Sequence, residues 1–198
     1  MAMISGSQTD TNALLFSLGA HTALDPLLAN GSLKNVYETF TPNWDSHTAQ
    51  AEMGAALNDR QNNIQVAYVA NDDMASGVIS SLSAVNLSGK VLVTGQDATA
   101  AGIHNILAGQ QSMTVYKPIE KEARSVGDLV KVIYSGSSDN ALTHGSTTAT
   151  FDGSNVPSIL DTPIVVDIHN IASTVIANHY LAKGDVCTGI PAGTAGVC

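Results

Sequence analysis

The sequence predicts an α/β fold built on a doubly wound, mainly parallel sheet. Short β-branched runs alternate with segments of helical periodicity from residue 1 to about residue 117, and such alternation is typical of βαβ units. The 198 residues are 44% hydrophobic and only 13% charged, which is enough apolar material for one domain or slightly more. The expected architecture is therefore Rossmann-like.

The first βα unit begins with a strand over residues 1–5 and a polar loop. Leucines then mark one side of a helix, which should stop near Pro26 and Gly31. These leucines are Leu14, Leu15, Leu18, Leu24, Leu27 and Leu28. The second strand is expected over residues 35–40.

The second helix should begin at Asp45 or Ser46, because both residues are good N-caps. Its buried positions at helical spacing are Ala49, Met53, Ala56 and Leu57. A third strand over residues 66–70 precedes a helix with another inward-facing set, namely Met74, Val78, Ile79 and Leu82. The fourth strand, residues 91–94, leads into a helix that carries Ile103, Ile106 and Leu107.

The fifth strand is expected over residues 113–116. Pro118 cannot donate a ladder hydrogen bond, so the chain should leave the sheet there and residues 1–117 should form one lobe. Within residues 118–145, a helix with one apolar stripe precedes a flexible segment. The stripe consists of Ile119, Ala123, Val126, Val130 and Ile133.

Residues 146–180 have a strand-like pattern with turn signals and end in a short helix that carries Ile171, Val175 and Ile176. Residues 181–198 form a tail with two cysteines, Cys187 and Cys198. These cysteines could close a disulfide in an oxidising compartment, or they could be free or mispaired thiols in a frayed terminus.

The charge balance excludes some partners. Seventeen acidic residues against eight basic ones give a net charge of −9, which repels phosphate backbones and anionic lipid surfaces, so nucleic acid is disfavoured. No apolar run reaches the roughly 20 residues that a membrane-spanning helix needs, so we expect no direct membrane insertion. The N-terminus also lacks the features of a signal peptide.

Polar residues follow each expected strand, at the sheet edge where ligands of open parallel sheets bind. In chain order they are Ser7, Asp10 and Asn12, then Trp44, then Asn71 and Asp72, then Gln96 and Asp97, and finally Lys117. Carboxylates, amides and a lysine offer hydrogen bonds to hydroxyl groups, and an aromatic face covers the apolar side of a pyranose ring. The set therefore predicts a sugar as the ligand.

Each of these residues also has a purely structural interpretation. Helix N-capping is the ordinary role of a short polar residue before a helical pattern, and it applies to Asp10, Asn71, Asp72 and Asp97. Trp44 can be a partly buried core aromatic, and Lys117 can be a solvated surface lysine.

Catalytic, metal and cofactor motifs are absent from the sequence. The six histidines show no ligand spacing, and neither phosphate-binding glycine motif occurs. The chain has no G-x-S-x-G nucleophile elbow. We therefore predict no cofactor, no metal and no enzymatic activity.

Several segments carry motifs in a specific order and spacing. They are Gly6–Ala13 (GSQTDTNA), Ala70–Asp72 (AND), Thr94–Ala98 (TGQDA), Met113–Ile119 (MTVYKPI) and the turns at 156–158 and 162–164. In these segments the chain resembles the periplasmic D-xylose-binding proteins, which are type I sugar-binding receptors of ABC importers. The resemblance extends to about residue 180. The family often has Asn-Asn where this chain has Thr11-Asn12, which affects the expected sugar preference.

The resemblance implies a binding protein for a monosaccharide, D-xylose or a related aldose, that works with the membrane permease of an ABC importer in the periplasm or outside the cell. By matching position, the sugar hydroxyls would be bound by Asp10, Asn12, Asn71, Asp97 and Lys117. Trp44 would stack on the sugar ring.

The resemblance also implies a two-lobed receptor of the type I periplasmic-binding-protein fold. Residues 1–117 would be its C-terminal lobe, and the N-terminal lobe is missing from this sequence. Residues 118–145 would pack on that missing lobe, residues 146–180 would be the returning strands and final helix, and residues 181–198 the tail.

Two alternatives use related folds. An effector-sensing domain of a LacI-type repressor or of a sensor-kinase complex would also bind a sugar, but a repressor would carry a basic helix-turn-helix upstream. The cysteine pair favours the exported receptor. A doubly wound enzyme would need a nucleophile or base paired with an orienting group, which the sequence does not show.

Overall fold

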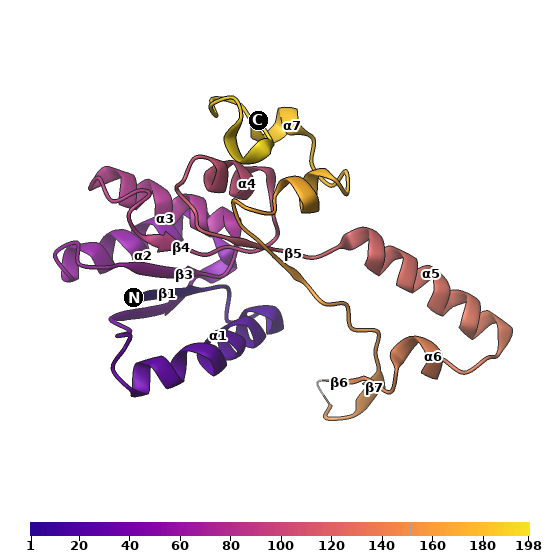
Figure 1. Cartoon of the computed structure of the whole chain (residues 1–198). Coiled ribbons are helices and arrows are strands. Elements are labelled where there is room, and N and C mark those ends of the chain that lie inside the picture. The colour runs from indigo at the N-terminus through magenta and orange to yellow at the C-terminus, as the bar shows by residue number, and fades with distance from the viewer. Residues whose placement is uncertain (151) are drawn as a thin grey trace. The chain divides into compact units, whose positions relative to one another are not determined.

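The computed structural model describes residues 1–150 and 152–198. The chain divides into two units (Figure 1). The larger unit comprises Met1–Tyr116 and Val165–Cys198, and the smaller unit comprises Lys117–Ile164. The chain therefore leaves the larger unit at Lys117 and returns to it at Val165.

The larger unit contains a four-stranded parallel sheet with the strand order β2-β1-β3-β4. Its strands are β1 (Ala2–Ser5), β2 (Tyr37–Phe40), β3 (Val66–Val69) and β4 (Leu92–Val93). Ala2 lies opposite Tyr37 on one side and Ala67 on the other. All residues of β1 are buried, as expected for a central strand flanked by parallel neighbours. The predicted α/β parallel architecture is confirmed.

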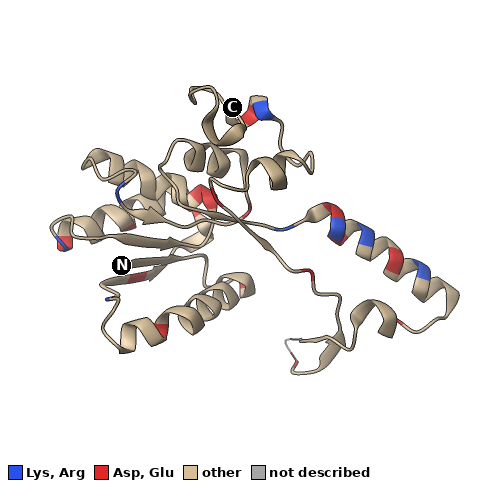
Figure 2. Ribbon diagram, in the orientation of Figure 1, with Lys and Arg blue, Asp and Glu red and all other residues tan. Residues whose placement is uncertain are grey.

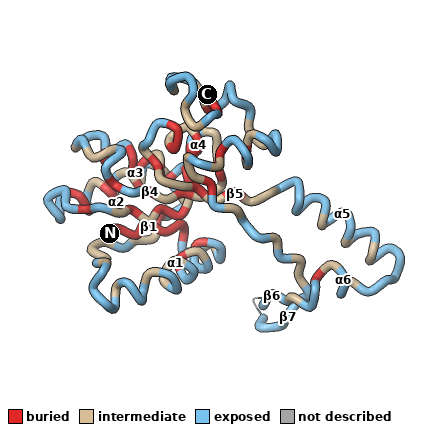
Figure 3. Tube along the Cα trace, in the orientation of Figure 1, coloured by how far each residue is buried: buried red, intermediate tan, exposed pale blue. Residues whose placement is uncertain are grey.

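Two helices, α2 (Ser46–Asp59) and α3 (Asp72–Ala84), pack together and cover one face of this sheet. Figure 3 shows the buried residues concentrated where these helices meet the strands. The positions predicted to face inward on α2 and α3 are all buried, and they share one core with Ala2, Ile4, Val69 and Val93. Helical spacing of apolar residues therefore predicted this part of the core correctly.

Helix α1 (Thr11–Ala29) packs against β1 on the opposite face from α2 and α3 (Figure 1). The prediction that the leucines of α1 face the sheet is wrong, because they are not the buried residues of this helix. The buried residues of α1 are Ala13 and Ser17, whose small side chains let the helix approach the sheet. Exposed fractions between 43% and 63% are found for Leu14, Leu15, Leu18 and Leu27.

The fifth strand, β5 (Thr114–Tyr116), does not join the four-stranded sheet and instead pairs with β8 (Ile164–Val166). Ser112 explains part of this difference. Its backbone nitrogen donates to Val93 O at 2.8 Å, and its hydroxyl accepts from Val93 N at 3.1 Å. A side chain thus occupies the position of the next ladder bond, and β4 ends after two residues.

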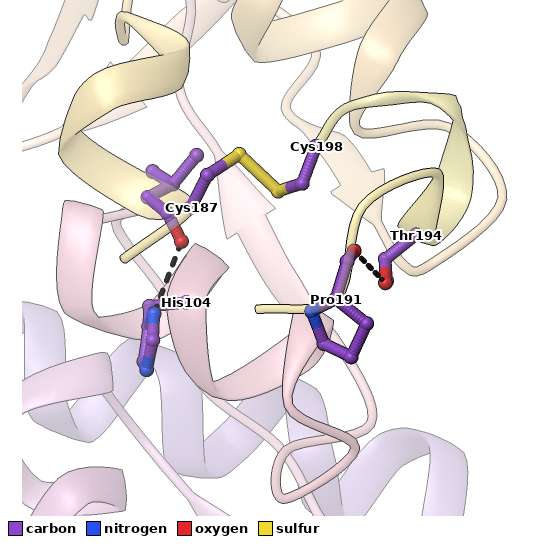
Figure 4. The surroundings of a disulfide bond; sticks show 6 residues. His104, Cys187, Pro191, Thr194 and Cys198 are labelled. Carbon is purple, nitrogen blue, oxygen red and sulfur yellow. Dashed lines mark hydrogen bonds between the residues drawn. A yellow bond between two sulfur atoms is a disulfide. The ribbon is translucent and has the colours of Figure 1, made fainter. Parts of the chain in front are cut away.

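The C-terminal segment of the larger unit packs against helix α4 (Ala100–Leu107). It contains a π-helical turn (Ala172–Ile176), helix α7 (Lys183–Val186) and a 3-10 turn (Thr194–Gly196). A disulfide joins Cys187 to Cys198 (Figure 4). The sequence left free thiols open as an alternative, and the structure contains the disulfide.

The smaller unit consists of α5 (Ile119–Ser135), α6 (Asn140–Thr143) and an antiparallel hairpin of β6 (Thr147–Ala149) and β7 (Asn155–Pro157). No residue of α5 is buried. Charges of both signs alternate along this helix (Figure 2), and Arg124 pairs with Glu120 at 2.6 Å.

The described part of the chain contains no helix that is both long and apolar enough to cross a membrane.

Candidate functional site

The loops that follow β1, β2, β3 and β4 are joined by backbone hydrogen bonds at the carboxyl edge of the sheet. Thr41 N donates to Ser5 O at 2.9 Å, which links the start of the loop after β2 to the end of β1. Asp72 N donates to Gln96 O at 3.0 Å, which links the loops after β3 and β4. The predicted residues Asp10, Trp44, Asn71 and Asp97 stand in these four loops.

Trp44 ends a 3-10 turn (Pro42–Trp44) in which Asn43 and Trp44 both have left-handed φ values, 56° and 57°. Its indole lies directly over Gly6, where a Cβ atom would overlap the six-membered ring. Phe16 of α1 meets the indole edge-on, with ring centroids 6.4 Å apart and an interplanar angle of 67°. The indole is half-buried and is held between two segments, so it forms a fixed aromatic surface.

Asp10 uses both carboxylate oxygens. Oδ1 caps α1 by accepting from Asn12 N at 2.8 Å, and Oδ2 accepts from Trp44 Nε1 at 3.1 Å. The capping interpretation is thus confirmed for Asp10, and the same carboxylate also orients the indole. Asn12 lies exposed in the first turn of α1.

Asn71 caps α3, because its Oδ1 accepts from Met74 N at 2.9 Å. The other end of its amide, Nδ2, makes no hydrogen bond to another described residue. Asn71 is only partly buried, so this amide group retains two donors for a ligand.

Asp97 and Asp72 are not helix caps, and the capping interpretation is wrong for both. Thr99 caps α4 by accepting from Gly102 N at 3.0 Å. Asp97 instead adopts a left-handed φ of 95°, and its backbone nitrogen donates to Val115 O at 2.9 Å. Asp72 lies in the first turn of α3, one residue after the cap.

Asp72 is fully buried. The sequence placed it among the polar residues at the strand ends, but not among the residues expected to bind the sugar. Its carboxylate accepts from Thr99 N at 2.8 Å and from Gln111 Nε2 at 2.8 Å. Burial raises the pKa of this carboxyl, and the hydrogen bonds oppose the shift. Gly95 and Gly102 approach it so closely that a Cβ atom on either would overlap the carboxylate.

The structure brings the predicted residues together only in part. Asp10 and Trp44 are in contact, and Asn12 bonds Asp10 through its backbone. Asn71 and Asp97 stand in loops that the 72-to-96 backbone bond joins. Lys117 follows β5 and is the first residue of the smaller unit.

Sequence reasoning missed Gly6, Phe16 and Asp72 as supports of this site. The sequence contained a signal for Gly6 and Asp72. Gly6 directly follows a predicted strand in the segment GSQTDTNA, and Asp72 directly follows Asn71 in the segment AND. Their contacts involve residues 27 to 39 positions away, which periodicity cannot reveal.

The chemistry available at this edge is hydrogen bonding and stacking. No serine, threonine or cysteine side chain among residues 1–150 and 152–198 is bonded to a histidine. Within the same described ranges, no three His, Cys, Asp or Glu side chains are grouped to hold a metal ion. Carboxylates, an amide and a fixed indole remain, which together can hold a polar ring with an apolar face.

Comparison with protein families gives a match over residues 1–138 to the family described as periplasmic binding protein domain. The chain is 38% identical over 191 residues to the D-xylose-binding periplasmic protein of Haemophilus influenzae, covering 93% of this chain and 54% of that protein. It is 39% identical to the protein of the same name from Escherichia coli, with the same coverage. The chain thus spans about half the length of these curated relatives.

Solved structures share the fold. An ABC transporter solute binding protein from Clostridium phytofermentans with bound β-D-glucose matches with a TM-score of 0.71 and 25% identity, over 93% of this chain and 59% of that chain. A carbohydrate transporter solute binding protein from Chloroflexus aurantiacus, in complex with D-glucose, matches with a TM-score of 0.75 and 22% identity, over 96% and 62% of the two chains.

Proposed function

Because the chain belongs to the family of periplasmic binding protein domains, we propose that it is the C-terminal lobe and hinge-return region of a sugar-binding receptor for an ABC importer. Its ligand is a monosaccharide, D-xylose or a related aldose, held in the cleft between this lobe and an N-terminal lobe. The observation that carries this proposal is the indole of Trp44, fixed over Gly6 and bonded to Asp10 at the carboxyl edge of the sheet.

Each site residue has a distinct role in this proposal. Trp44 stacks on the apolar face of the sugar ring, a contact that depends on shape and on a fixed ring plane. The hydroxyl groups of the sugar are bound by Asp10, Asn12, Asn71, Asp97 and Lys117. The partial burial of Asn71 and Asp97 supports this assignment, since each side chain is held by the fold yet reaches solvent.

The rest of the chain connects this lobe to the other parts of the receptor. Residues 1–117 are the sugar-binding lobe, and residues 118–145 pack on the N-terminal lobe through the exposed apolar stripe of α5. Residues 146–180 return to the larger unit, and residues 181–198 are its tail. The partner in the membrane is the importer's permease.

The Cys187–Cys198 disulfide supports a periplasmic or extracellular location, because disulfides persist in oxidising compartments. The D-xylose-binding relatives are named as periplasmic proteins. The same disulfide disfavours the alternative of a cytosolic repressor domain.

The test is a two-lobed protein, made by joining the N-terminal lobe of the Escherichia coli relative to residue 1, and titrated with D-xylose while the fluorescence of Trp44 is followed. Trp44→Ala, which has no tryptophan fluorescence and is titrated by calorimetry, should weaken binding by about 1 to 3 kcal/mol, because the apolar platform is lost. Trp44→Phe should retain much of the affinity. Any other tryptophan in the added lobe is replaced by phenylalanine so that the signal comes from Trp44.

Asp97→Ala in the same protein should weaken binding by roughly 1.5 to 3 kcal/mol, the range of a hydrogen bond to a charged group. If xylose left the fluorescence unchanged and Trp44→Ala bound as tightly as the parent, Trp44 would be a core residue and the proposed ligand position would be wrong.

A further inference from the structure

The backbone at Asp97 and Ala98 has an unfavourable conformation, and the next residue, Thr99, returns to an extended one. Asp97 and Ala98 are consecutive non-glycine residues with left-handed φ values of 95° and 49°. The left-handed region is sparsely populated by residues with a Cβ atom, and such conformations persist where surrounding contacts enforce them. Because Asp97 is a proposed ligand residue, the contacts that enforce its backbone conformation also set where its carboxylate stands.

Three consecutive backbone N–H groups of this segment are fixed by hydrogen bonds to other elements. Asp97 N donates to Val115 O at 2.9 Å, and Ala98 N donates to the Thr114 hydroxyl at 3.1 Å, so both are held by β5. Thr99 N donates to the buried Asp72 carboxylate at 2.8 Å. Thr99 also donates its hydroxyl to the same Asp72 oxygen at 3.3 Å.

The carbonyl of Asp97 is held from the other end of the chain. The hydroxyl of Tyr180 donates to Asp97 O at 3.2 Å, across 83 positions in sequence. The ring of Tyr180 rests on that of Tyr116, with centroids 4.8 Å apart. Tyr180 is therefore fixed by the strand that precedes Lys117 while its hydroxyl reaches the loop after β4.

The segment that carries Tyr180 is itself attached to α4. His104 Nδ1 lies 3.0 Å from Val186 O, and Figure 4 shows this bond beside the Cys187–Cys198 disulfide. Val186 and Val197 are buried, with exposed fractions of 0% and 2%. The tail is thus packed onto the helix that begins directly after Thr99.

We propose that Asp72 and Tyr180 are positioning residues for sugar binding, and that they hold Asp97 and Ala98 in the left-handed conformation that aims the Asp97 side chain at the ligand. The part of this inference that concerns sugar binding rests on the proposed function. Asp72 holds the segment from β3 and α3, and Tyr180 holds it from the C-terminal segment. Neither residue touches the sugar.

The experiment separates backbone positioning from sugar affinity. In the 198-residue chain labelled with ¹⁵N and ¹³C, three-bond HN–Hα couplings and amide shifts report the φ values of Asp97 and Ala98. Tyr180→Phe removes one hydroxyl and keeps the ring contact with Tyr116. We expect it to change both couplings while the unfolding midpoint moves little.

In the two-lobed protein, Tyr180→Phe should raise the Kd for D-xylose about fivefold to tenfold, the effect of losing one neutral hydrogen bond. Asp72→Asn should raise it further, and Asp72→Ala is avoided because it would leave a buried void. The matched control is Tyr134→Phe, which removes the hydroxyl of a tyrosine that is 93% exposed on α5 and should change neither the couplings nor the Kd.

Each outcome has a definite meaning. Couplings that stay unchanged in Tyr180→Phe overturn the positioning role. Changed couplings with an unchanged Kd, in a parent that binds xylose, overturn the link between this conformation and binding. A two-lobed parent that binds no sugar refutes the proposed function, whereas the couplings measured in the 198-residue chain for Tyr180→Phe and for Asp72→Asn still decide whether each residue holds the segment.

Discussion

Gly6 and Trp44 show how a single missing side chain leaves room for a fixed aromatic ring. The indole lies where a Cβ atom of residue 6 would be, and it is also bonded to Asp10 and met edge-on by Phe16. Gly6→Ala should therefore displace the ring, and overpacking of this kind costs about 1 to 3 kcal/mol of stability. We expect a lower free energy of unfolding in urea and a shifted emission maximum for Trp44.

Gly19→Ala is the control for this substitution. Gly19 lies within α1, and nothing stands within 4 Å of the position that its Cβ would occupy. Alanine there should stabilise the chain by about 0.5 to 1 kcal/mol, because glycine weakens a helix interior. If Gly6→Ala behaved like Gly19→Ala, the indole would not occupy the place that the structure gives it.

His21 connects α1 to β2 and makes this connection depend on pH. Its Nδ1 lies 2.8 Å from Asp25 Oδ1 and its Nε2 lies 2.9 Å from Glu38 Oε1. The hydrogen bond to Asp25, then that to Glu38, raises the pKa of His21. A protonated imidazole donates to both carboxylates, whereas a neutral one donates to only one.

A histidine whose folded pKa is raised contributes stability that is fully present below its unfolded pKa of about 6.5 and is lost as the pH rises through the folded pKa. We therefore expect the free energy of unfolding to fall more steeply as the pH rises above about 6.5 in the parent than in His21→Gln, as measured by urea denaturation. His179→Asn is the control, because the imidazole of His179 makes no hydrogen bond to another described residue, and only its backbone nitrogen donates one, to Ile176 O. Equal pH slopes in the parent and His21→Gln would contradict the pairing.

Among the elements, α5 combines a charged side with an unpartnered apolar stripe. Exposed fractions of 55% to 67% are found for Ile119, Val126, Val130 and Ile133. Exposed apolar patches of this kind mark interaction surfaces or promote association. The isolated chain should therefore self-associate or bind a hydrophobic dye, and Val126→Glu should reduce both effects in light scattering and dye fluorescence.

Arg124→Gln changes the charged side of the same helix and should leave dye binding unchanged. A parent chain that is strictly monomeric and does not bind the dye would mean that the stripe has a partner within the chain, and the proposed packing of α5 on the N-terminal lobe would lose its support.

The buried face of a helix could be predicted where its apolar residues recur at helical spacing. Contacts that depend on residues far away in the sequence could not be predicted. The buried faces of α2 and α3 follow helical spacing, and every predicted inward residue is buried. On α1 the leucines are abundant, but Ala13 and Ser17 make the contact with β1 because small residues permit close approach. The pairing of β5 with β8 joins segments about 50 residues apart and has no local signal.

At the scale of the whole molecule, the candidate site too could be predicted only where it depends on local sequence patterns. The strand-end position of Asp10, Trp44, Asn71 and Asp97 follows from the parallel sheet, so sequence could place them at one edge. Their supports come from other parts of the chain: Gly6 lies under Trp44, and Tyr180 bonds to the backbone of Asp97. Such supports depend on tertiary packing, which a pattern of residue types does not specify.

The lobe by itself should bind sugar poorly. Small-ligand sites bury about 70 to 90% of the ligand surface, whereas the edge that carries Trp44 and Asn71 provides a single wall. A receptor with a Kd of about 1 μM has a binding free energy of about −8 kcal/mol, and losing half of that leaves a Kd of about 1 mM. Calorimetry of the monomeric 198-residue chain with D-xylose should therefore detect weak binding or none, and the two-lobed protein should restore tight binding. Micromolar binding by the monomeric chain would mean that one wall suffices, and the ligand would then be buried by residues of this chain alone.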